Sequence, residues 1–365
     1  MKNKKLLIDI IVFFVGMVSM YLLIYYVLPI NKDNTIINKS EKEVTVTDAG
    51  IADAVEKLYD SVVVITGISN NQEASGGTGF VYKIDGKKAY ILTNNHVISG
   101  MDAAKVTFTS GEEIDAKIIG GDANSDTAVL SVESNEIAKV ANIGSSSEAR
   151  LGDTVFTIGS PVSKDYSWTV TRGILSGKDR MVQVSLSNKN TAENYALKVL
   201  QTDASINSGN SGGPLANANG EVIGITNMKL VSDSIEGIGF AIPIEDAVTI
   251  AEDIIDDGKV ERPLLGVSMM DLSNRYNLYQ QGITLNTELT SGVVVVEVQK
   301  GSPASKAGLK RGDIIIGLND DSAGDVATLR YLLYKHSVGD TVTIKYERDG
   351  KIETVNVKLT VANEN

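Results

Sequence analysis

Residues 207–215 read "NSGNSGGPL", a run of asparagine, serine and glycine with the composition of a loop. Asp203 precedes the run, and the strand-like segment "EVIGIT" follows it. Glycines beside Ser211 let the backbone turn tightly and leave room for another molecule to approach the hydroxyl group. The run is therefore either a flexible spacer or a turn that presents Ser211 as a nucleophile.

A serine nucleophile needs a base, a carboxylate that orients the base, and backbone N–H donors for the developing oxyanion. The chain has only two histidines, His96 and His336. His96 lies in the polar turn "LTNNHVI" after an apolar strand, and Asp126 directly precedes the apolar run "TAVL". Asp122, in the preceding turn, is a second candidate, although an aspartate there more often caps the turn or is solvated. The order along the chain is His96, Asp126, Ser211.

Short β-type runs separated by Gly, Asn, Asp and Ser surround these residues. Many short strands at near-regular spacing predict a barrel or sandwich, not alternating βαβ units. Helical periodicity returns within residues 242–259, and Gly258 is the predicted end of the helix. An α/β-hydrolase would need the order Ser, acid, His, and the only histidine after Ser211 is His336. We therefore set that fold aside.

A second unit of about 100 residues opens at "ERPLLGV", which is a domain-sized length. It contains strand-like runs and a helix predicted over residues 325–336. His336 falls at the end of this helix, where a histidine suits the helix dipole, so we expect a structural role for it.

Composition excludes several classes of function. The formal net charge is −12, which argues against a nucleic-acid partner because no basic stripe is available to neutralise phosphates. The chain has no cysteine, which excludes disulfides, thiolate zinc sites and thiol catalysis. A metal site with two histidine ligands would need His96 and His336, which lie in different predicted domains. We expect no metal and no organic cofactor.

The N-terminus contains an uncharged apolar run over residues 10–30, preceded by Lys2, Lys4 and Lys5. As a helix it would span about 30 Å, roughly one hydrocarbon core. It lacks a small-residue cleavage site and ends in "YYVLPI", so we expect an uncleaved single-pass anchor. Three lysines flank each side of the run, so lysine counts leave its orientation open. The lysines before the run lie closer to it than those after it, which favours an N-terminus inside the cell.

At this point the segments "TNNHVI", "SDTAVL", "TDASINSGNSGGPL" and "GIGFAIP" closely resemble the motifs of the HtrA/Deg family of chymotrypsin-fold serine proteases. The segments "LLGV" and "GSPASKAGLKRGDIIIGLN" resemble the PDZ domain of that family. The resemblance covers roughly residues 49–360. It implies a mainly β fold, with a chymotrypsin-like double β-barrel protease domain of two six-stranded barrels, followed by a PDZ domain.

The implied domain boundaries are a stub and anchor over 1–30, a tether over 31–48, a protease domain over 49–258 and a PDZ domain over 259–361. The resemblance also implies His96 as general base, Asp126 as its orienting carboxylate and Ser211 as nucleophile. It assigns the oxyanion hole to the loop of Gly209, Asn210 and Ser211.

Ser205 stands six residues before the nucleophile, where the family shapes the floor of its specificity pocket. Since Ser205 is not an aspartate, selectivity for Lys or Arg is not expected. With Ile206 and Ile225 it suggests an apolar pocket for small or medium aliphatic side chains.

Two positions depart from the family pattern. Ser208 stands where proline is common, and a proline would stiffen the loop, so the oxyanion loop here is expected to become disordered more easily. Thr127 replaces a usual leucine after Asp126, and its hydroxyl either donates a hydrogen bond beside the carboxylate or faces the core.

In the PDZ-like unit the resemblance assigns the peptide-binding loop to Leu265, Gly266 and Val267. A PDZ domain takes the C-terminus of a partner as an added strand. Residues 177–198 match the position of a regulatory sensor loop, and their polarity suggests an exposed, mobile loop. Homotrimers formed through the protease domain are implied in the same way.

These features together predict a membrane-anchored, ATP-independent serine endopeptidase of protein quality control and stress response. Its domains would lie on the extracytoplasmic side of the cell membrane. Its substrates would be misfolded or damaged exported and membrane proteins, and PDZ peptide binding would regulate it. The alternative is a non-catalytic, membrane-tethered chaperone or PDZ scaffold on a protease-like core. Physiological substrates, the PDZ ligand and the activity of the resting state stay open.

Overall fold

The computed structural model describes residues 13–20, 48–137, 139–160, 167–188, 191–227 and 237–361. Residues 13–20 are helical. The predicted anchor and tether otherwise lie outside the described residues. Among the described residues, no helix is both long and apolar enough to span a bilayer.

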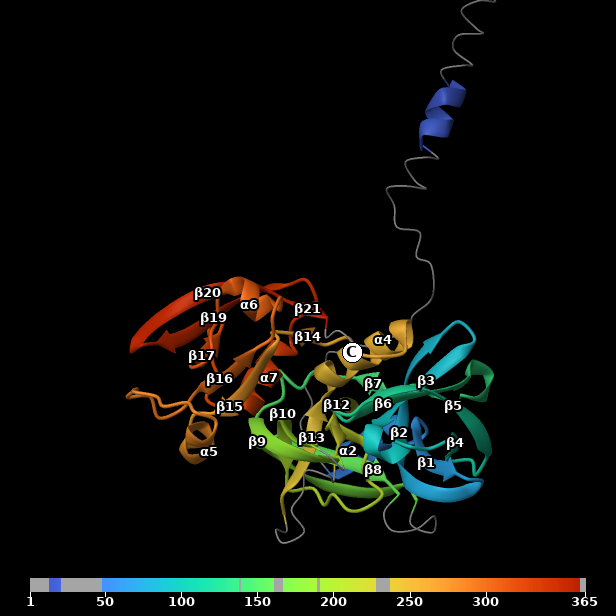
Figure 1. Cartoon of the computed structure of the whole chain (residues 1–365). Helices are drawn as coiled ribbons and strands as arrows, with labels where there is room; N and C mark the ends of the chain where they lie inside the picture. Colours follow the sequence, from blue (N-terminus) through green and yellow to red (C-terminus); the bar gives the residue numbers. More distant parts are fainter. Residues whose placement is uncertain are drawn as a thin grey trace, which may run out of the picture.

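A closed six-stranded barrel forms the first half of the larger domain, with strand order β1-β2-β3-β6-β5-β4 (Figure 1). The helix α2 (Asp48–Tyr59) precedes it, and α3 (Asn95–Ile98) and the 3-10 turn η1 (Ser134–Glu136) follow β3 and β6. The strands are β1 (Val62–Ser69), β2 (Gln72–Asp85), β3 (Lys88–Asn94), β4 (Ala103–Thr107), β5 (Glu113–Asp122) and β6 (Thr127–Glu133).

The second half is a seven-stranded sheet in the order β11-β8-β9-β10-β13-β12-β7. An additional β11–β12 pairing closes six of these strands into a second barrel, with β7 parallel to β12. The strands are β7 (Asn142–Ile143), β8 (Thr154–Gly159), β9 (Thr169–Asn188), β10 (Thr191–Thr202), β11 (Pro214–Asn217), β12 (Glu221–Thr226) and β13 (Gly239–Pro243). The predicted double barrel is confirmed.

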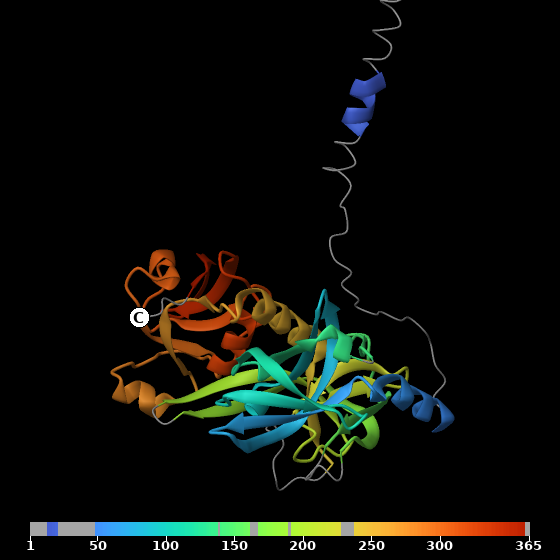
Figure 2. The ribbon, with the colours of Figure 1, turned by 90° about the vertical axis from the view of Figure 1, so that its right-hand side faces the viewer.

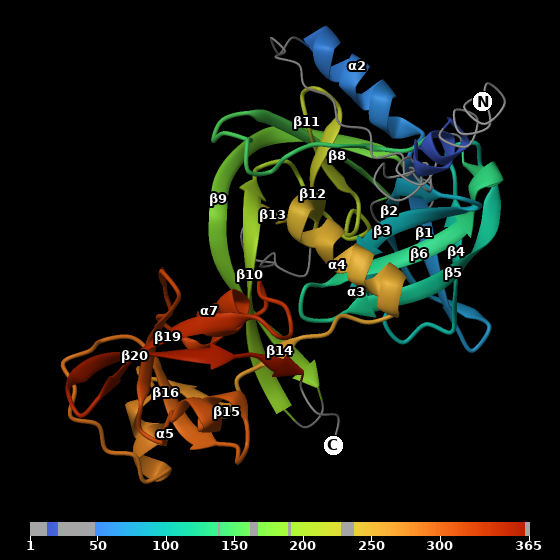
Figure 3. The same ribbon diagram turned by 90° about the horizontal axis from the view of Figure 1, so that it is seen from above.

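The helix α4 (Ile244–Asp257) packs against strands of both barrels (Figure 3). Its buried face carries Ala247, Ala251 and Ile254, and Gly258 ends it in the left-handed conformation. One apolar core joins these parts, since it includes Phe80 and Leu92 from the first barrel as well as residues from the second. The two barrels therefore share one apolar core, which sets how they pack on each other.

Residues 177–188 and 191–198 lie in two paired antiparallel strands, so the expectation of a loop there was wrong, while its mobility stays a prediction. β9 and β10 pair from Thr202↔Leu175 to Thr191↔Asn188. The cause is the two-residue alternation in "MVQVSLS", which suits a strand although the segment is polar overall. The hairpin extends from the second barrel beneath the smaller domain (Figure 2).

The smaller domain is a five-strand path, β15-β16-β17-β19-β20, with β18 on β17 and a separate β14–β21 pair. Its strands are β14 (Pro263–Leu264), β15 (Val267–Asp271), β16 (Val293–Val298), β17 (Ile314–Leu318), β18 (Asp321–Ser322), β19 (Thr341–Arg348), β20 (Lys351–Lys358) and β21 (Thr360–Val361). Its helices are α5 (Arg275–Gln280), α6 (Pro303–Ala307) and α7 (Val326–Leu333). Figure 3 shows α7 beside β10, against which it packs.

Candidate active site

The register of the first barrel brings His96 and Asp126 together. β3 and β6 are neighbours with Asn94 opposite Thr127, so the residues next to these strand ends meet at one rim. His96 Nδ1 lies 2.7 Å from Asp126 Oδ2, and the His96 backbone N–H donates to Asp126 Oδ1 over 2.9 Å. Asp126 thus holds His96 at two points, its backbone N–H and its ring Nδ1, and leaves the Nε2 edge of the imidazole for another partner.

Asp126 is buried, with 1% of its surface exposed, and its backbone is left-handed at φ 52°. A buried carboxylate needs hydrogen-bond donors, and a second side chain supplies one. Asn227 Nδ2 donates to Asp126 Oδ2 over 2.8 Å, the oxygen that also faces His96. The backbone carbonyl of Asp126 accepts from Asn94 Nδ2 at 2.9 Å and from the Asn95 N–H at 3.0 Å.

Asn227 was not found from the sequence. Its only signal is a polar residue that follows the apolar strand β12, and its partner lies 101 positions earlier. It is fully buried at the junction of the two barrels.

Asp122, the other candidate carboxylate, serves the turn instead. It accepts from the Ser125 N–H at 2.7 Å and from Ser125 Oγ at 2.6 Å, and it forms an ion pair with Arg262. The hydroxyl of Thr127 donates to the Ser125 carbonyl over 3.4 Å and is fully buried. It therefore serves the turn rather than the Asp126 carboxylate.

Ser211 lies between the two barrels in a turn that depends on glycine. It is 5% exposed. A Cβ atom at Gly212, where φ is 86°, would lie 2.2 Å from both the Thr78 carbonyl and Thr93 Oγ1, so no side chain fits there. A Cβ atom at Gly77 would lie 2.7 Å from Val97 and 3.1 Å from the Ser211 carbonyl. The residue after His96 and the backbone of Ser211 therefore approach the same point on β2.

The hydrogen bonds of the serine turn show which N–H groups of the predicted oxyanion loop are already engaged. The Asn210 N–H donates to the Asn207 carbonyl over 3.0 Å, so assigning it to the oxyanion hole was wrong. The N–H groups of Gly212 and Gly213 donate to Thr226 and Asn210. The assignment of the Gly209 and Ser211 amides as oxyanion donors stays a prediction.

The structure places one of the three residues predicted for the specificity pocket in the core instead. Ile225 is fully buried on β12 opposite Ile242, in the core that joins the barrels, so placing it in the pocket was wrong. Ile206 is 8% exposed and packs on Gly239, where a Cβ atom would come within 2.5 Å of it. Ser205 is exposed, and its carbonyl accepts from Thr171 Oγ1 at 2.9 Å.

The predicted peptide-binding loop precedes β15, which lies at the end of its sheet with β16 as its neighbour. Leu265 is buried in the domain core, so only its backbone is available to a ligand. Gly266 has φ 75°, and a Cβ atom there would lie 2.2 Å from Ser302 Cβ. A cavity of about 480 Å³ borders Gly266 and Val267.

His336 lies just beyond α7, with Nε2 3.3 Å from Asn319 Nδ2.

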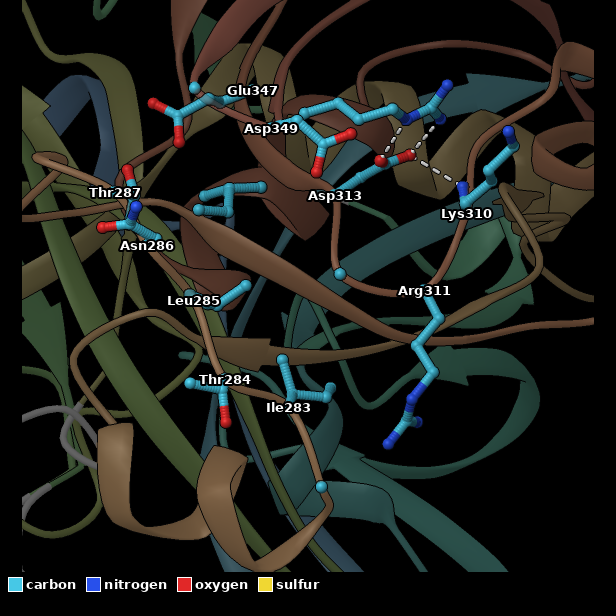
Figure 4. A pocket seen from close by; sticks show the side chains of 15 residues that line it. Ile283, Thr284, Leu285, Asn286, Thr287, Lys310, Arg311, Asp313, Glu347 and Asp349 are labelled. Atoms are coloured by element: carbon cyan, nitrogen blue, oxygen red, sulfur yellow. Dashed lines mark hydrogen bonds and ion pairs between the residues drawn. The ribbon is translucent and has the colours of Figure 1, made fainter.

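Two further cavities are present. One of about 400 Å³ lies beside the serine turn and is lined by Ser208, Gly209 and Ser160 together with β1 and β2. Another, of about 690 Å³, lies in the smaller domain among loops 282–287, 310–314 and 347–350 (Figure 4). Its walls are tied by Arg348, whose Nε and Nη2 donate to Asp313 at 2.7 and 2.6 Å (Figure 4). None of the candidate site residues predicted from the sequence lines this second cavity, although residues 310–314 belong to the PDZ-like segment.

Within the described part of the chain, no group of three or more His, Cys, Asp or Glu side chains is arranged to hold a metal ion.

Comparison with known proteins identifies both domains. Residues 77–225 match the trypsin-like peptidase domain family, and residues 263–359 match the PDZ domain family. The Do-like serine protease HtrA of Bacillus subtilis (strain 168) is 45% identical over 328 residues, which cover 85% of this chain and 72% of the relative. A Do-like HtrA of Lactococcus lactis subsp. cremoris (strain MG1363) is 37% identical over 357 residues, covering 90% and 87%.

Solved structures agree. The serine endoprotease from Yersinia pestis aligns with a TM-score of 0.64 and 30% identity, covering 88% of this chain and 100% of that chain. The HtrA-type protease AlgW with decapeptide aligns with a TM-score of 0.66 and 28% identity, covering 86% and 99%. The chain therefore belongs to the HtrA family of serine proteases, with a trypsin-like peptidase domain followed by a PDZ domain.

Proposed function

We propose that the protein hydrolyses peptide bonds with Ser211 as nucleophile, His96 as general base and Asp126 as the carboxylate that orients His96. The bond between His96 Nδ1 and Asp126 Oδ2, at 2.7 Å, carries the proposal, because it holds the imidazole with Nε2 directed away from the carboxylate. The Ser211 turn supports it, since this turn packs on β2 beside the residue that follows His96.

In this mechanism Ser211 Oγ attacks the scissile carbonyl while His96 Nε2 accepts the hydroxyl proton. The amides of Gly209 and Ser211 stabilise the oxyanion. His96 then gives the proton to the leaving amine, which departs and leaves an acyl-enzyme. Water attacks the acyl group with His96 again as base, and Ser211 is regenerated. None of these steps needs ATP, a metal or an organic cofactor.

Unfolded or damaged proteins are the proposed substrates, with small or medium aliphatic side chains before the scissile bond. The contact between Ile206 and Gly239 supports this preference, since it lines the region after Ser205 with apolar atoms. The rival proposal is a chaperone or scaffold that binds such proteins without cleaving them.

Replacing Ser211 by alanine distinguishes the two functions. We expect Ser211→Ala to abolish cleavage of unfolded casein and labelling by a fluorophosphonate, because both require the hydroxyl nucleophile. His96→Ala should reduce labelling sharply. Equal cleavage by wild type and Ser211→Ala would overturn the serine mechanism. If neither cleaves and both suppress aggregation, the scaffold function holds instead.

The donor from Asn227 to Asp126 gives a second prediction. Hydrogen bonds to charged groups contribute about 1.5–3 kcal/mol, and part of this is lost from the transition state when the buried carboxylate loses one donor. We expect Asn227→Ala to lower kcat for a chromogenic peptide roughly ten-fold, with KM nearly unchanged. Asn356→Ala, in the PDZ sheet, is the control and should keep full activity. An unchanged kcat in Asn227→Ala with a normal melting curve would exclude this role.

Regulation by the PDZ domain is the next part of the proposal, and contacts between the domains support it. Arg262 pairs with Asp122 in the turn that leads to Asp126, and its guanidinium lies 4.4 Å from the ring centre of Tyr334 at the end of α7. Its Nε is buried without a hydrogen-bond partner among the described residues. A movement of α7 would therefore reach the turn of the catalytic carboxylate through one side chain.

The PDZ domain also meets the hairpin, because α7 packs on β10 near an ion pair of the two hairpin strands. Lys198 lies 2.5 Å from Asp179, and this hydrogen bond lowers the pKa of Asp179. The positive charge of Lys335, from the PDZ domain, lowers the pKa of Asp179 further. One charge of the PDZ domain, that of Lys335, therefore has an electrostatic influence on the β9–β10 hairpin.

We predict that Arg262→Met weakens the coupling between PDZ occupancy and catalysis. Methionine keeps an apolar stem but removes the ion pair and the contact of the cation with the aromatic ring. The ratio of kcat/KM with and without peptides that end in a free Val or Phe carboxylate should move towards one. Arg275→Met, on the exposed helix α5, is the matched control. A ratio equal to that of wild type would exclude Arg262 as the connection, and no response in wild type would exclude PDZ regulation.

Membrane anchoring and an extracytoplasmic position of both domains are proposed from the uncharged run over residues 10–30. A homotrimer formed through the protease domain is proposed with them. An exposed apolar strip of Leu151, Val170 and Ile174 on that domain supports self-association.

The anchor is tested by alkaline extraction of membranes. Aspartate near the centre of a spanning helix costs about 2.5–3.5 kcal/mol, so Val15→Asp with Val18→Asp should move the protein from the pellet to the supernatant. Wild type and the control Val15→Leu with Val18→Leu should stay in the pellet. Digestion of the domains by protease added to intact cells tests the orientation. Release of wild type by carbonate would contradict the anchor.

A further inference from the structure

Thr78 on β2 makes more contacts with the serine turn than its position in a barrel strand requires. It is fully buried. Its backbone N–H donates to the Ser211 carbonyl over 2.9 Å, and its Oγ1 donates to the Gly209 carbonyl over 2.7 Å. The same oxygen accepts the Ser160 N–H over 3.1 Å. One residue of the first barrel thus contacts two loops of the second.

The hydroxyl bond orients one peptide group of the loop. The carbonyl of the peptide between Gly209 and Asn210 is held by Thr78, and its N–H is held by the Asn207 carbonyl at 3.0 Å. A peptide group is planar, so holding both ends leaves it no rotation of its own. The direction of this peptide limits the ψ angle of Gly209, whose φ is 99°, and so limits where its own N–H points.

The Thr78 hydroxyl also accepts a hydrogen bond, from the residue that follows β8. Ser160 begins the segment after β8, and its Oγ lies 3.0 Å from Ser167 Oγ, at the far end of that segment. Because a threonine hydroxyl both donates and accepts, Thr78 connects the oxyanion loop to Ser160, the first residue after β8. Valine has the same shape and lacks both functions.

We propose that Thr78 is a positioning residue for catalysis, whose hydroxyl fixes the oxyanion loop through the Gly209 carbonyl. The proposal rests on the assignment of Ser211 as nucleophile and goes beyond it, because it makes transition-state stabilisation depend on a side chain that touches neither the substrate nor the catalytic triad. Thr78 acts through Gly209, so its loss should affect kcat far more than KM.

The test compares Thr78→Val with Thr78→Ser in the full chain. Removing an oxyanion donor outright costs about 10²–10³ in kcat, and misorienting one should cost less, so we expect Thr78→Val to lower kcat roughly 10- to 100-fold with KM within about two-fold. Thr78→Ser keeps the donor and should recover most of the rate. The Ki of a peptide boronate, whose anionic oxygen occupies the oxyanion hole, should rise by the factor by which kcat falls.

Thr157 provides a matched control. It is a fully buried threonine on β8, and its Oγ1 has no hydrogen-bond partner among the described residues. Thr157→Val therefore removes a hydroxyl that satisfies nothing, and it should leave kcat unchanged with an equal or higher melting temperature. A similar loss of kcat in both valine variants would indicate general damage to the barrels and would overturn the proposal.

Further outcomes separate this inference from the proposed function. Wild-type kcat and boronate Ki in a folded Thr78→Val would exclude the positioning role, while loss of activity in Ser211→Ala would leave the serine mechanism intact. If Thr78→Val does not fold, Thr78→Cys replaces it, since a thiol is a weaker donor of similar size. The order Ser above Cys in kcat then supports the proposal, and equal rates contradict it.

Discussion

The contact between the two barrels at Gly212 is the constraint on which the site depends. The backbone of the serine turn lies so close to the Thr78 carbonyl and the Thr93 hydroxyl that a single Cβ atom would lie 2.2 Å from both. Neither barrel carries the site alone, because His96 and Asp126 come from the first and Ser211 from the second. The shared apolar core and the helix α4 hold the barrels together, and the close backbone contact fixes the serine turn against β2 of the first barrel.

Much of this arrangement could be predicted because the relevant residues sit where strands end. His96 follows β3 and Asp126 precedes β6, so a strand pattern together with a polar residue at its boundary was enough to select them. Residues whose role depends on long-range pairing could not be found in this way. Asn227 becomes a partner of Asp126 only when the second barrel closes, and nothing in its neighbours along the chain indicates that.

The wrong predictions have physical causes of the same kind. Ile225 was assigned to a pocket because it is apolar and near the site in sequence, but strand alternation directs it into the core. Asn210 was assigned to the oxyanion hole because it lies between Gly209 and Ser211, but its N–H is used to close the turn on Asn207. The hairpin of β9 and β10 was read as a loop because polarity outweighed its two-residue alternation. The polar composition of this segment indicates only that it is exposed, whereas its strand pairing determines its structure.

In the loop before Ser211, the peptide group after Gly209 is restrained by hydrogen bonds, whereas the peptide group before Gly209 is less restrained. The peptide after Gly209 is bound at both ends, by Thr78 and by Asn207. The peptide before Gly209 joins it to Ser208, where the family commonly has a proline that would fix φ. Glycine accepts a wide range of φ values, so this peptide lacks the restraint that a proline before it would add, and the contact with Thr78 matters the more.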